Sequence, residues 1–249
     1  MTEVYFVTGA NRGIGYAVVE ELSKRSNVKI IATVRSIEKA ENLISLKNKT
    51  GNVEIVSLDV SSEESVDALD EQLQKVAPDG IDVYISNAAH FDCLYTVKDA
   101  PRHIWINHYK TNVLGPILVY QVLYPYLVKK ETRKIIFISS SGGSIGQYFP
   151  LSISAYGQSK AALNYTGKEL SSELEAENFI VISLHPGVVA TDGADDFKAK
   201  VNNPALIEAF EQLSITPATS AIKQLEVIDG LTKESTGKFF SYDGSEIPW

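Results

Sequence analysis

A tyrosine and a lysine four residues apart, Tyr156 and Lys160, are the first candidates for chemistry in this sequence. In a helix, residues at i and i+4 lie on one face about one turn apart, so the phenol and the ammonium would be held on the same side. Tyrosine has a pKa of about 10, and a fixed positive charge nearby favours the phenolate and lowers that pKa. Such a pair can donate and accept a proton near neutral pH, although the spacing is common by chance.

Three consecutive serines precede this pair and follow a short apolar run. If the run is a strand of a parallel sheet, a hydroxyl just beyond it lies at the carboxyl edge of the sheet, where ligands bind. Ser139, Ser140 and Ser141 are therefore candidates for contact with a substrate.

A glycine-rich segment is the second chemical feature, and it reads Thr8-Gly9-Ala10-Asn11-Arg12-Gly13-Ile14-Gly15. Glycines let the backbone turn tightly and approach a ligand closely. The N–H groups at the start of a following helix would then face an anion. An apolar run before the segment and a helical pattern after it indicate a dinucleotide pyrophosphate as the ligand. A tight turn without a ligand is the alternative.

The end of the second apolar run indicates which dinucleotide would bind. Folds that prefer NAD place an acid there, on the ribose 2′-hydroxyl. Val34 fills that position here, Arg35 follows it, and Arg12 lies in the glycine-rich segment. Two guanidinium groups without an acid suit a 2′-phosphate, which arginine grips with a fork of N–H donors. The alternative is two solvated surface arginines.

Short apolar runs alternate along the chain with longer helical patterns, and these elements must position the chemical groups. The near-continuous hydrophobicity of the runs is typical of parallel strands buried on both faces. The runs are Val4–Val7, Lys29–Val34, Val53–Leu58, Val83–Ser86, Ile135–Ser139, Ile180–Leu184 and the weaker Gly237–Tyr242. Helices are expected over Ile14–Lys24, from Ser61 and Ser62 onward, and over Thr111–Val128 and Ser154–Leu174. This order predicts an α/β fold: a doubly wound, Rossmann-type parallel sheet of about seven strands with helices on both faces.

Composition sets the broad class of the protein. The chain has 249 residues, of which 44% are hydrophobic and 22% charged, and we expect one globular domain over residues 1–249. The net charge of −8 argues against nucleic acid or an anionic membrane as a partner. We expect a cytoplasmic protein, because no apolar run approaches a membrane span and the start lacks a signal-peptide pattern. We expect no metal site, because Cys93 is the single cysteine and the histidines lack ligand spacing.

The spacing T-G-x-x-x-G-x-G, together with Y-x-x-x-K, resembles the short-chain dehydrogenase/reductase family over nearly the whole chain, from Val4 to about Tyr242. The resemblance implies NADP(H) as cofactor and a small-molecule carbonyl compound as substrate. It aligns Ser140 with the serine that binds the carbonyl oxygen, with Ser139 and Ser141 as alternatives. Tyr156 would donate the proton, and Lys160 would lower the tyrosine pKa and bind the nicotinamide ribose. Asn112 would hold a water that links Lys160 to solvent, or serve a helix kink, or both.

The resemblance also implies cofactor contacts along the sheet edge. Asp59 and Val60 would meet the adenine, with a helix-capping role for Asp59 as a second interpretation. Asn87 keeps the amide of a family motif. The segment from Pro186 to Thr191, after the sixth run, would contact the nicotinamide carboxamide. Asp192, which follows it, is expected to cap the next helix. The full set of expected contacts is Gly9, Asn11, Arg12, Gly13, Ile14, Gly15, Arg35, Asp59, Val60, Asn87, Tyr156, Lys160, Pro186, Gly187, Val189 and Thr191.

Two further segments are expected to shape the substrate site. Residues of about 190–214 resemble the family's mobile substrate-binding segment. Sixteen positions separate Ser140 from Tyr156, slightly more than in the family, and we place the extra residues in Gln147–Ile153 as a substrate wall. The two long helices over Thr111–Val128 and Ser154–Leu174 could form a homodimer interface or face the sheet alone.

Within the family, the tail from Gly237 to Trp249 resembles sniffer-type and C-factor-like carbonyl reductases, including fungal ketoreductases. The leading hypothesis is therefore an NADPH-dependent carbonyl reductase. A dedicated biosynthetic ketoreductase and a hydroxysteroid or polyol dehydrogenase are alternatives within the same class. An NADP(H)-binding sensor or signalling protein without significant turnover is the alternative from another class.

Overall fold

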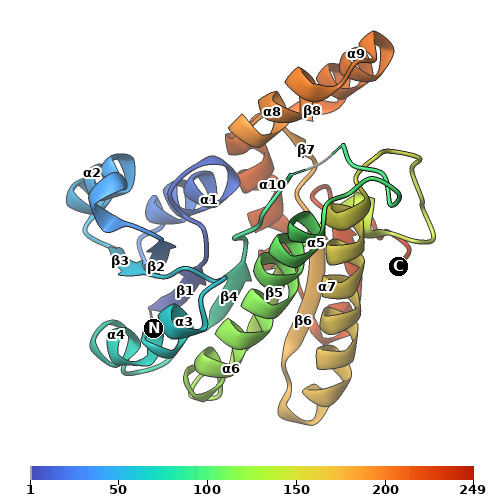
Figure 1. Ribbon diagram of the computed structural model, residues 1–249. Helices are drawn as coiled ribbons and strands as arrows, with labels where there is room; N and C mark the ends of the chain where they lie inside the picture. Colours follow the sequence, from blue (N-terminus) through green and yellow to red (C-terminus); the bar gives the residue numbers. More distant parts are fainter. Residues whose placement is uncertain (1, 93) are drawn as a thin grey trace.

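A computed structural model of the protein describes residues 2–92 and 94–249, so the expectation for Cys93 lies outside the described residues. Within these residues the chain forms a seven-stranded, all-parallel sheet in the order β3-β2-β1-β4-β5-β6-β9 (Figure 1). The strands are β1 Glu3–Val7, β2 Val28–Val34, β3 Val53–Ser57, β4 Val83–Ser86, β5 Lys134–Ile138, β6 Ile180–His185 and β9 Phe239–Ser241. The predicted doubly wound sheet is confirmed, and each of its strands overlaps a predicted apolar run.

Both faces of the sheet are covered by helices, which explains why the strands are apolar at nearly every position. In β1, Tyr5 and Val7 face one hydrophobic cluster, whereas Val4 and Phe6 face the other. Helices α1 Gly13–Ser23, α2 Glu41–Thr50 and α10 Pro217–Asp229 contribute to the first cluster. Helices α3 Glu63–Asp67, α4 Leu69–Val76, α6 Gly115–Leu127 and α7 Ser154–Glu173 contribute to the second.

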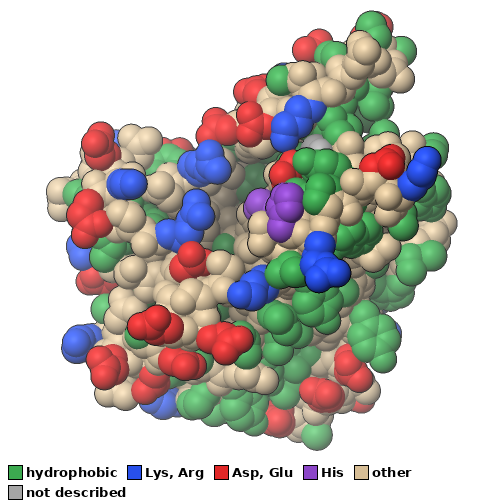
Figure 2. Space-filling view, viewed as in Figure 1, with side chains coloured by type: hydrophobic (Ala, Val, Ile, Leu, Met, Phe, Trp, Pro, Cys, Tyr) green, Lys and Arg blue, Asp and Glu red, His purple; other side chains and the backbone are tan. Residues whose placement is uncertain are grey.

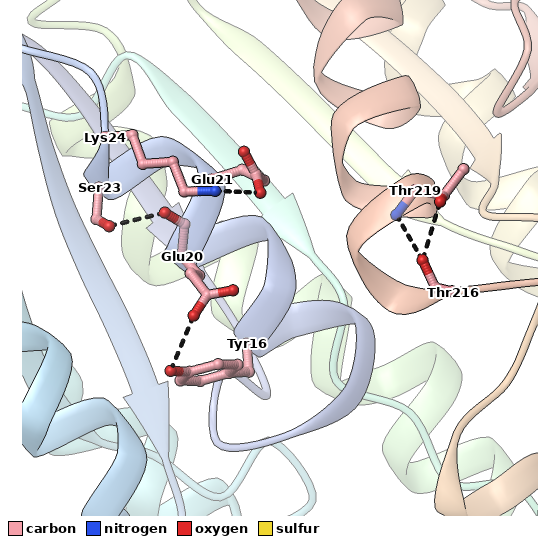
Figure 3. A network of polar contacts seen from close by, with 7 residues as sticks. All are labelled: Tyr16, Glu20, Glu21, Ser23, Lys24, Thr216 and Thr219. Atoms are coloured by element: carbon pink, nitrogen blue, oxygen red, sulfur yellow. Dashed lines mark hydrogen bonds and ion pairs between the residues drawn. The ribbon is translucent and has the colours of Figure 1, made fainter.

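Polar side chains form hydrogen bonds along α1 and at the start of α10 (Figure 3). The Tyr16 hydroxyl donates to the Glu20 carboxylate, and the Ser23 hydroxyl donates to the Glu20 carbonyl oxygen. The Thr216 hydroxyl caps α10 by accepting a hydrogen bond from the Thr219 N–H. Within the described chain, no side chain caps the N-terminus of α1, in contrast to α10. The first amides of α1 are therefore available to a ligand.

The strand order reverses at β1, which pairs with β2 on one side and with β4 on the other. Ligands of doubly wound sheets bind at such a switch point, beyond the carboxyl ends of the strands. Figure 2 shows a hollow on this face between α1 and α5 (Arg102–Tyr109). Lysine and arginine side chains line one rim of the hollow and histidine side chains line the other.

Two segments differ from the predicted elements. The long helix expected over Thr111–Val128 begins earlier, as α5, and passes through a π-helical turn at Lys110–Leu114 before α6. The predicted substrate segment contains α8 Asp192–Lys200 and α9 Pro204–Leu213. A two-stranded parallel ladder of β7 Val188–Val189 and β8 Ser214–Ile215 closes its base. Two-residue strands leave no periodic pattern, so the sequence could not reveal this ladder.

Candidate active site

The glycine-rich segment adopts a backbone that only glycines satisfy. Gly9 and Gly13 have positive φ values of 67° and 57°, in the left-handed region. A Cβ at Gly15 would overlap the carbonyl oxygen of Gly9 and lie 2.5 Å from Nδ2 of Asn87. The backbone thus curls against the uncapped start of α1, where Asn11, Arg12 and Ile14 also lie. The residues fit a dinucleotide pyrophosphate, because helix N-termini of this kind bind anions.

Asn87 braces this segment from the neighbouring strand. Its Nδ2 donates to the carbonyl oxygens of Thr8 and Gly9, at 2.9 and 3.2 Å. The Thr8 hydroxyl oxygen in turn accepts from the N–H groups of Asn87 and Ala88, each at 3.0 Å. The predicted amide at position 87 therefore joins the carboxyl ends of β1 and β4 and shapes the glycine-rich turn.

The two arginines expected at a 2′-phosphate are both exposed. Arg35 directly follows β2, and Arg12 precedes α1. The Nη1 atom of Arg12 lies 2.9 Å from Oδ2 of Asp192, and both side chains are more than 70% exposed. Asp192 is the first residue of α8, whose N-cap is Thr191. The expected capping role of Asp192 is therefore wrong, because its carboxylate turns towards Arg12 instead.

Asp59 shapes the loop after β3. Its Oδ1 accepts from the N–H and the hydroxyl of Ser61, at 2.9 and 2.7 Å. The N-cap of α3 is Ser62, whose hydroxyl accepts from the Ser65 N–H. The capping interpretation of Asp59 is therefore wrong. Val60 is buried beside it in the second hydrophobic cluster.

The loop after β6 closes on the glycine-rich segment from the other side. Gly187 has φ 89°, and a Cβ there would lie 2.9 Å from Cδ1 of Ile215, so only glycine fits. The Pro186 carbonyl oxygen accepts from the buried Ser220 hydroxyl at 2.6 Å. A Cβ at Gly13 would lie 3.5 Å from Cγ2 of Thr191. Val189 lies in β7 and pairs with Ile215 of β8, and this ladder holds the loop after β6 close to Gly13.

Tyr156 lies in the first turn of α7 and Lys160 lies one turn later, as predicted. The Lys160 Nζ is 5.9 Å from the centre of the Tyr156 ring and donates to the Ile138 carbonyl oxygen at 2.8 Å. The Lys160 side chain is buried, with 2% of the residue exposed. Because burial disfavours the charged ammonium, the pKa of Lys160 is lowered to about 7. The helix thus places near the Tyr156 ring a lysine whose amine gains or loses its proton close to neutral pH.

The serines after β5 differ in their surroundings. Ser139 is buried, and its hydroxyl donates to Oδ1 of Asn164 at 2.6 Å. Ser140 is half-buried, and its oxygen accepts from the Gly142 N–H at 3.1 Å, so its hydroxyl can still donate. A Cβ at Gly143 would lie 2.7 Å from Cβ of Lys160, so the turn after Ser140 packs directly on α7. These contacts favour Ser140 over Ser139.

Asn112 lies in the π-helical turn, a helix irregularity that is frequent at functional sites. Its Oδ1 accepts from the His90 N–H at 2.7 Å, and its Nδ2 donates to the His90 carbonyl oxygen at 2.9 Å. Nδ2 also donates to the Ser159 hydroxyl at 2.9 Å. Asn112 therefore ties the loop after β4 to the residue that precedes Lys160.

Three aromatic side chains that the sequence did not predict as part of the site form a chain of ring contacts with Tyr156: His90, His108 and Phe91. The rings of His90 and His108 are 4.7 Å apart, and His108 is 6.2 Å from the Tyr156 ring. The His108 Nε2 accepts from the Asp92 N–H, so its Nδ1 donates to the Ile104 carbonyl oxygen. The ring is therefore neutral, and burial lowers its pKa. The sequence held one indication of this: His108 lies four positions before Asn112, and such residues are neighbours on one face of a helix.

Phe91 completes the surroundings of Tyr156 and connects it to α8 and α9. Its ring meets the Tyr156 ring edge-on at 4.7 Å and lies 6.4 Å from the buried Phe197. Phe197 in turn lies 5.1 Å from Phe210 of α9. The apolar residues of the predicted substrate segment thus divide: Phe197 is buried, whereas Leu213 is 65% exposed.

The burial of Lys160 predicts a pH-dependent stability of the cofactor-free protein. Its folded pKa, about 7, lies below its ordinary value of 10.5, so between these values the unfolded chain binds a proton that the folded protein does not. The unfolding free energy should therefore rise with pH in this window. Relative to Lys160→Met, the wild type should gain about 2 kcal/mol between about pH 7 and pH 9 in urea titrations. Parallel pH profiles would show that Lys160 is not desolvated.

The described residues, 2–92 and 94–249, contain no group of three or more His, Cys, Asp or Glu side chains placed to hold a metal ion. In the same part of the chain, no helix has the length and apolar character needed to span a membrane.

The fold and the site together define a dinucleotide-binding oxidoreductase: a glycine cradle lies at the switch point, and a tyrosine–lysine pair lies at the same sheet edge. The sequence profile described as short chain dehydrogenase matches residues 3–202. The chain therefore belongs to the short-chain dehydrogenase/reductase family, as the sequence resemblance indicated.

Relatives and solved structures agree with this assignment. An uncharacterised oxidoreductase of Schizosaccharomyces pombe is 45% identical over 249 residues, covering 99% of this chain and 98% of the relative. The NADPH-bound carbonyl reductase from chicken fatty liver is 28% identical with a TM-score of 0.89, covering 100% of this chain and 99% of that one. The carbonyl reductase Sniffer of D. melanogaster is 27% identical with a TM-score of 0.86 and full coverage of both chains.

Proposed function

We propose that the protein is an NADPH-dependent carbonyl reductase that converts a ketone or aldehyde to an alcohol. The observation that carries this proposal is the packing of the turn after Ser140 on the helix that presents Tyr156 and Lys160. This packing brings the Ser140 turn to the helix that carries the Tyr156 hydroxyl and the buried Lys160 amine, at the sheet edge where the glycine-rich turn also lies. The similarity to two carbonyl reductases supports the same activity.

The residues have distinct roles in this proposal. Ser140 donates a hydrogen bond to the substrate carbonyl oxygen, and the Tyr156 hydroxyl gives its proton to the same oxygen. Lys160, protonated, stabilises the negative charge left on the Tyr156 oxygen, which in turn favours the ammonium form of the lysine. A water held at Asn112 would link Lys160 to solvent. When bound, the cofactor supplies the hydride that completes the reduction.

The cofactor is proposed to be NADP(H), held by residues on both sides of the switch point. The start of α1 and the glycine turn would hold the pyrophosphate. Arg12 and Arg35 would bind the 2′-phosphate, while Asp59 and Val60 would line the adenine side. The loop Pro186–Thr191 would contact the nicotinamide. The segment of residues 190–214, with α8 and α9, would cover the substrate within a single catalytic domain.

The direct test is the oxidation of NADPH by purified protein, followed by the loss of nicotinamide absorbance. The panel contains aldehydes, diketones, quinones and aromatic ketones, with NADH in parallel and alcohols plus NADP⁺ for the reverse direction. We expect turnover of carbonyl compounds with NADPH strongly preferred. Turnover of only one narrow substrate class would favour a dedicated biosynthetic or hydroxysteroid or polyol enzyme. Tight NADPH binding without turnover on any of them would favour a sensor and contradict the proposal.

A further inference from the structure

The last three residues, Ile247–Trp249, lie against the loop that joins the Ser140 turn to α7. Figure 1 shows the C-terminus beside this loop, which is drawn in yellow-green. The Ser144 hydroxyl donates to the Pro248 carbonyl oxygen at 2.5 Å, and the Gly146 N–H donates to the Trp249 backbone oxygen at 2.7 Å. A Cβ at Gly146 would lie 3.0 Å from that same oxygen. The tail and the loop are therefore in direct backbone contact.

The contact is built around the buried side chain of Ser144, which is 3% exposed. While its hydroxyl donates to Pro248, its oxygen accepts from the Gln147 N–H at 2.9 Å. One side chain thus turns the loop backbone and joins it to the tail. Because the group is buried, loss of either partner would leave an unpaired polar atom.

The tail is itself fixed to the sheet. The Ile247 N–H donates to the Phe239 carbonyl oxygen of β9 at 2.8 Å, and Ile247 is buried. The Trp249 ring stacks on the Phe239 ring with centroids 5.6 Å apart and planes 23° apart. Stacked aromatic pairs of this kind add stability beyond the area that they bury. The tail therefore connects the loop to the start of β9.

The loop begins next to Ser140 and ends next to Tyr156, so its course affects the site between them. At its far end the Ser154 hydroxyl donates to the Tyr95 carbonyl oxygen at 2.7 Å. Between these two attachments the loop exposes Tyr148 and Phe149, at 74% and 46%. Large apolar side chains exposed beside a site are candidates for ligand contact. They can hold a defined position only if the loop backbone is fixed at both ends.

We propose that Ser144 and Trp249 are positioning residues for the substrate site: they dock the tail on the loop 144–153 and so hold the apolar wall carried by Tyr148 and Phe149. The inference rests on the proposed reductase function, because the wall acts on bound substrate. By holding this wall in place, the tail would favour the binding of bulky apolar carbonyl compounds. Small aldehydes, which do not reach the wall, should be insensitive to the tail.

The test compares Trp249→Ala and Ser144→Ala with the wild type. Trp249→Phe keeps a stacked ring and serves as the conservative rescue. Glu246→Gln is the matched control, because Glu246 is an exposed residue directly before the tail and is paired with Lys238 and not with the loop. Hydrogen exchange of the amides of residues 144–153 reports the docking independently of turnover. Steady-state kinetics with a bulky aromatic ketone and a small aldehyde report its effect on the substrate.

We expect faster exchange in the loop for both alanine variants, with KM for the bulky ketone raised roughly tenfold. The kcat, the KM for the small aldehyde and NADPH affinity should change less than about twofold, and Trp249→Phe should resemble the wild type. Unchanged exchange would overturn the docking, and faster exchange with an unchanged KM would overturn the role in recognition. If the wild type turned over no carbonyl compound, the reductase function would fail. Equal affinity of the wild type and Trp249→Ala NADPH complexes for the ketone, by calorimetry, would then overturn this inference.

Discussion

Replacing Tyr156 with phenylalanine is expected to lower kcat for carbonyl reduction by about 10²–10⁴-fold, the usual contribution of a positioned proton donor. The ring would keep its edge-on contact with Phe91 at 4.7 Å and its place near His108, because both contacts involve the ring itself. Only the hydroxyl would be lost. NADPH affinity should therefore stay within about threefold of the wild type, since the cradle at α1 is untouched.

The matched control is Tyr165→Phe, which removes a hydroxyl from an exposed position on the same helix. It should keep full activity. NADPH affinity is measured by fluorescence titration and turnover by absorbance, so that binding and chemistry are separated. If Tyr156→Phe kept more than about a tenth of the wild-type kcat, Tyr156 would not be the proton donor.

The strands and the tyrosine–lysine pair could be predicted from the sequence because their signals are local. A strand buried on both faces is apolar at every position, and two residues one helical turn apart are close in any α-helix. The positions of Tyr156 and Lys160 in α7 follow from this, and so does the turn at Gly9 and Gly13. In each case the physical cause lies within a few residues of its effect.

The remaining features depend on contacts between distant segments. Residues 90 and 108 are 18 positions apart, and the loop that carries His90 is tied to the π-helical turn after His108 by the hydrogen bond of its N–H to Asn112 Oδ1. The ladder of β7 and β8 joins Val188 to Ser214, and its two-residue strands have no pattern of their own. The ion pair of Arg12 with Asp192 spans 180 positions and reassigned a residue expected to cap a helix. Such pairings are set by the packed sheet and not by local propensity.

The ion pair of Arg12 with Asp192 also affects the expected preference for NADPH over NADH. Arg12 and Arg35 are exposed on the side of the switch point where the ribose of a dinucleotide would lie. The Arg12 guanidinium forms an ion pair with the Asp192 carboxylate. A 2′-phosphate would compete with this carboxylate for the guanidinium, and it would prevail because it carries more negative charge. An exposed ion pair contributes only about 0–1 kcal/mol, so the exchange costs little.

The double variant Arg12→Ala, Arg35→Ala is therefore expected to lose most of its preference for NADPH. Hydrogen bonds to charged groups contribute about 1.5–3 kcal/mol each, so the NADPH-to-NADH ratio of kcat/KM should fall by roughly 100-fold or more. Arg25→Ala, which removes an arginine at the opposite end of α1, should leave the ratio unchanged. Asp192→Asn should keep NADPH affinity or raise it by up to about threefold, because Arg12 no longer has a competing partner. A ratio that stays the same in the double variant would remove both arginines from the 2′-phosphate site. A loss of NADPH affinity in Asp192→Asn would instead show that Asp192 positions Arg12 for the phosphate and does not compete with it.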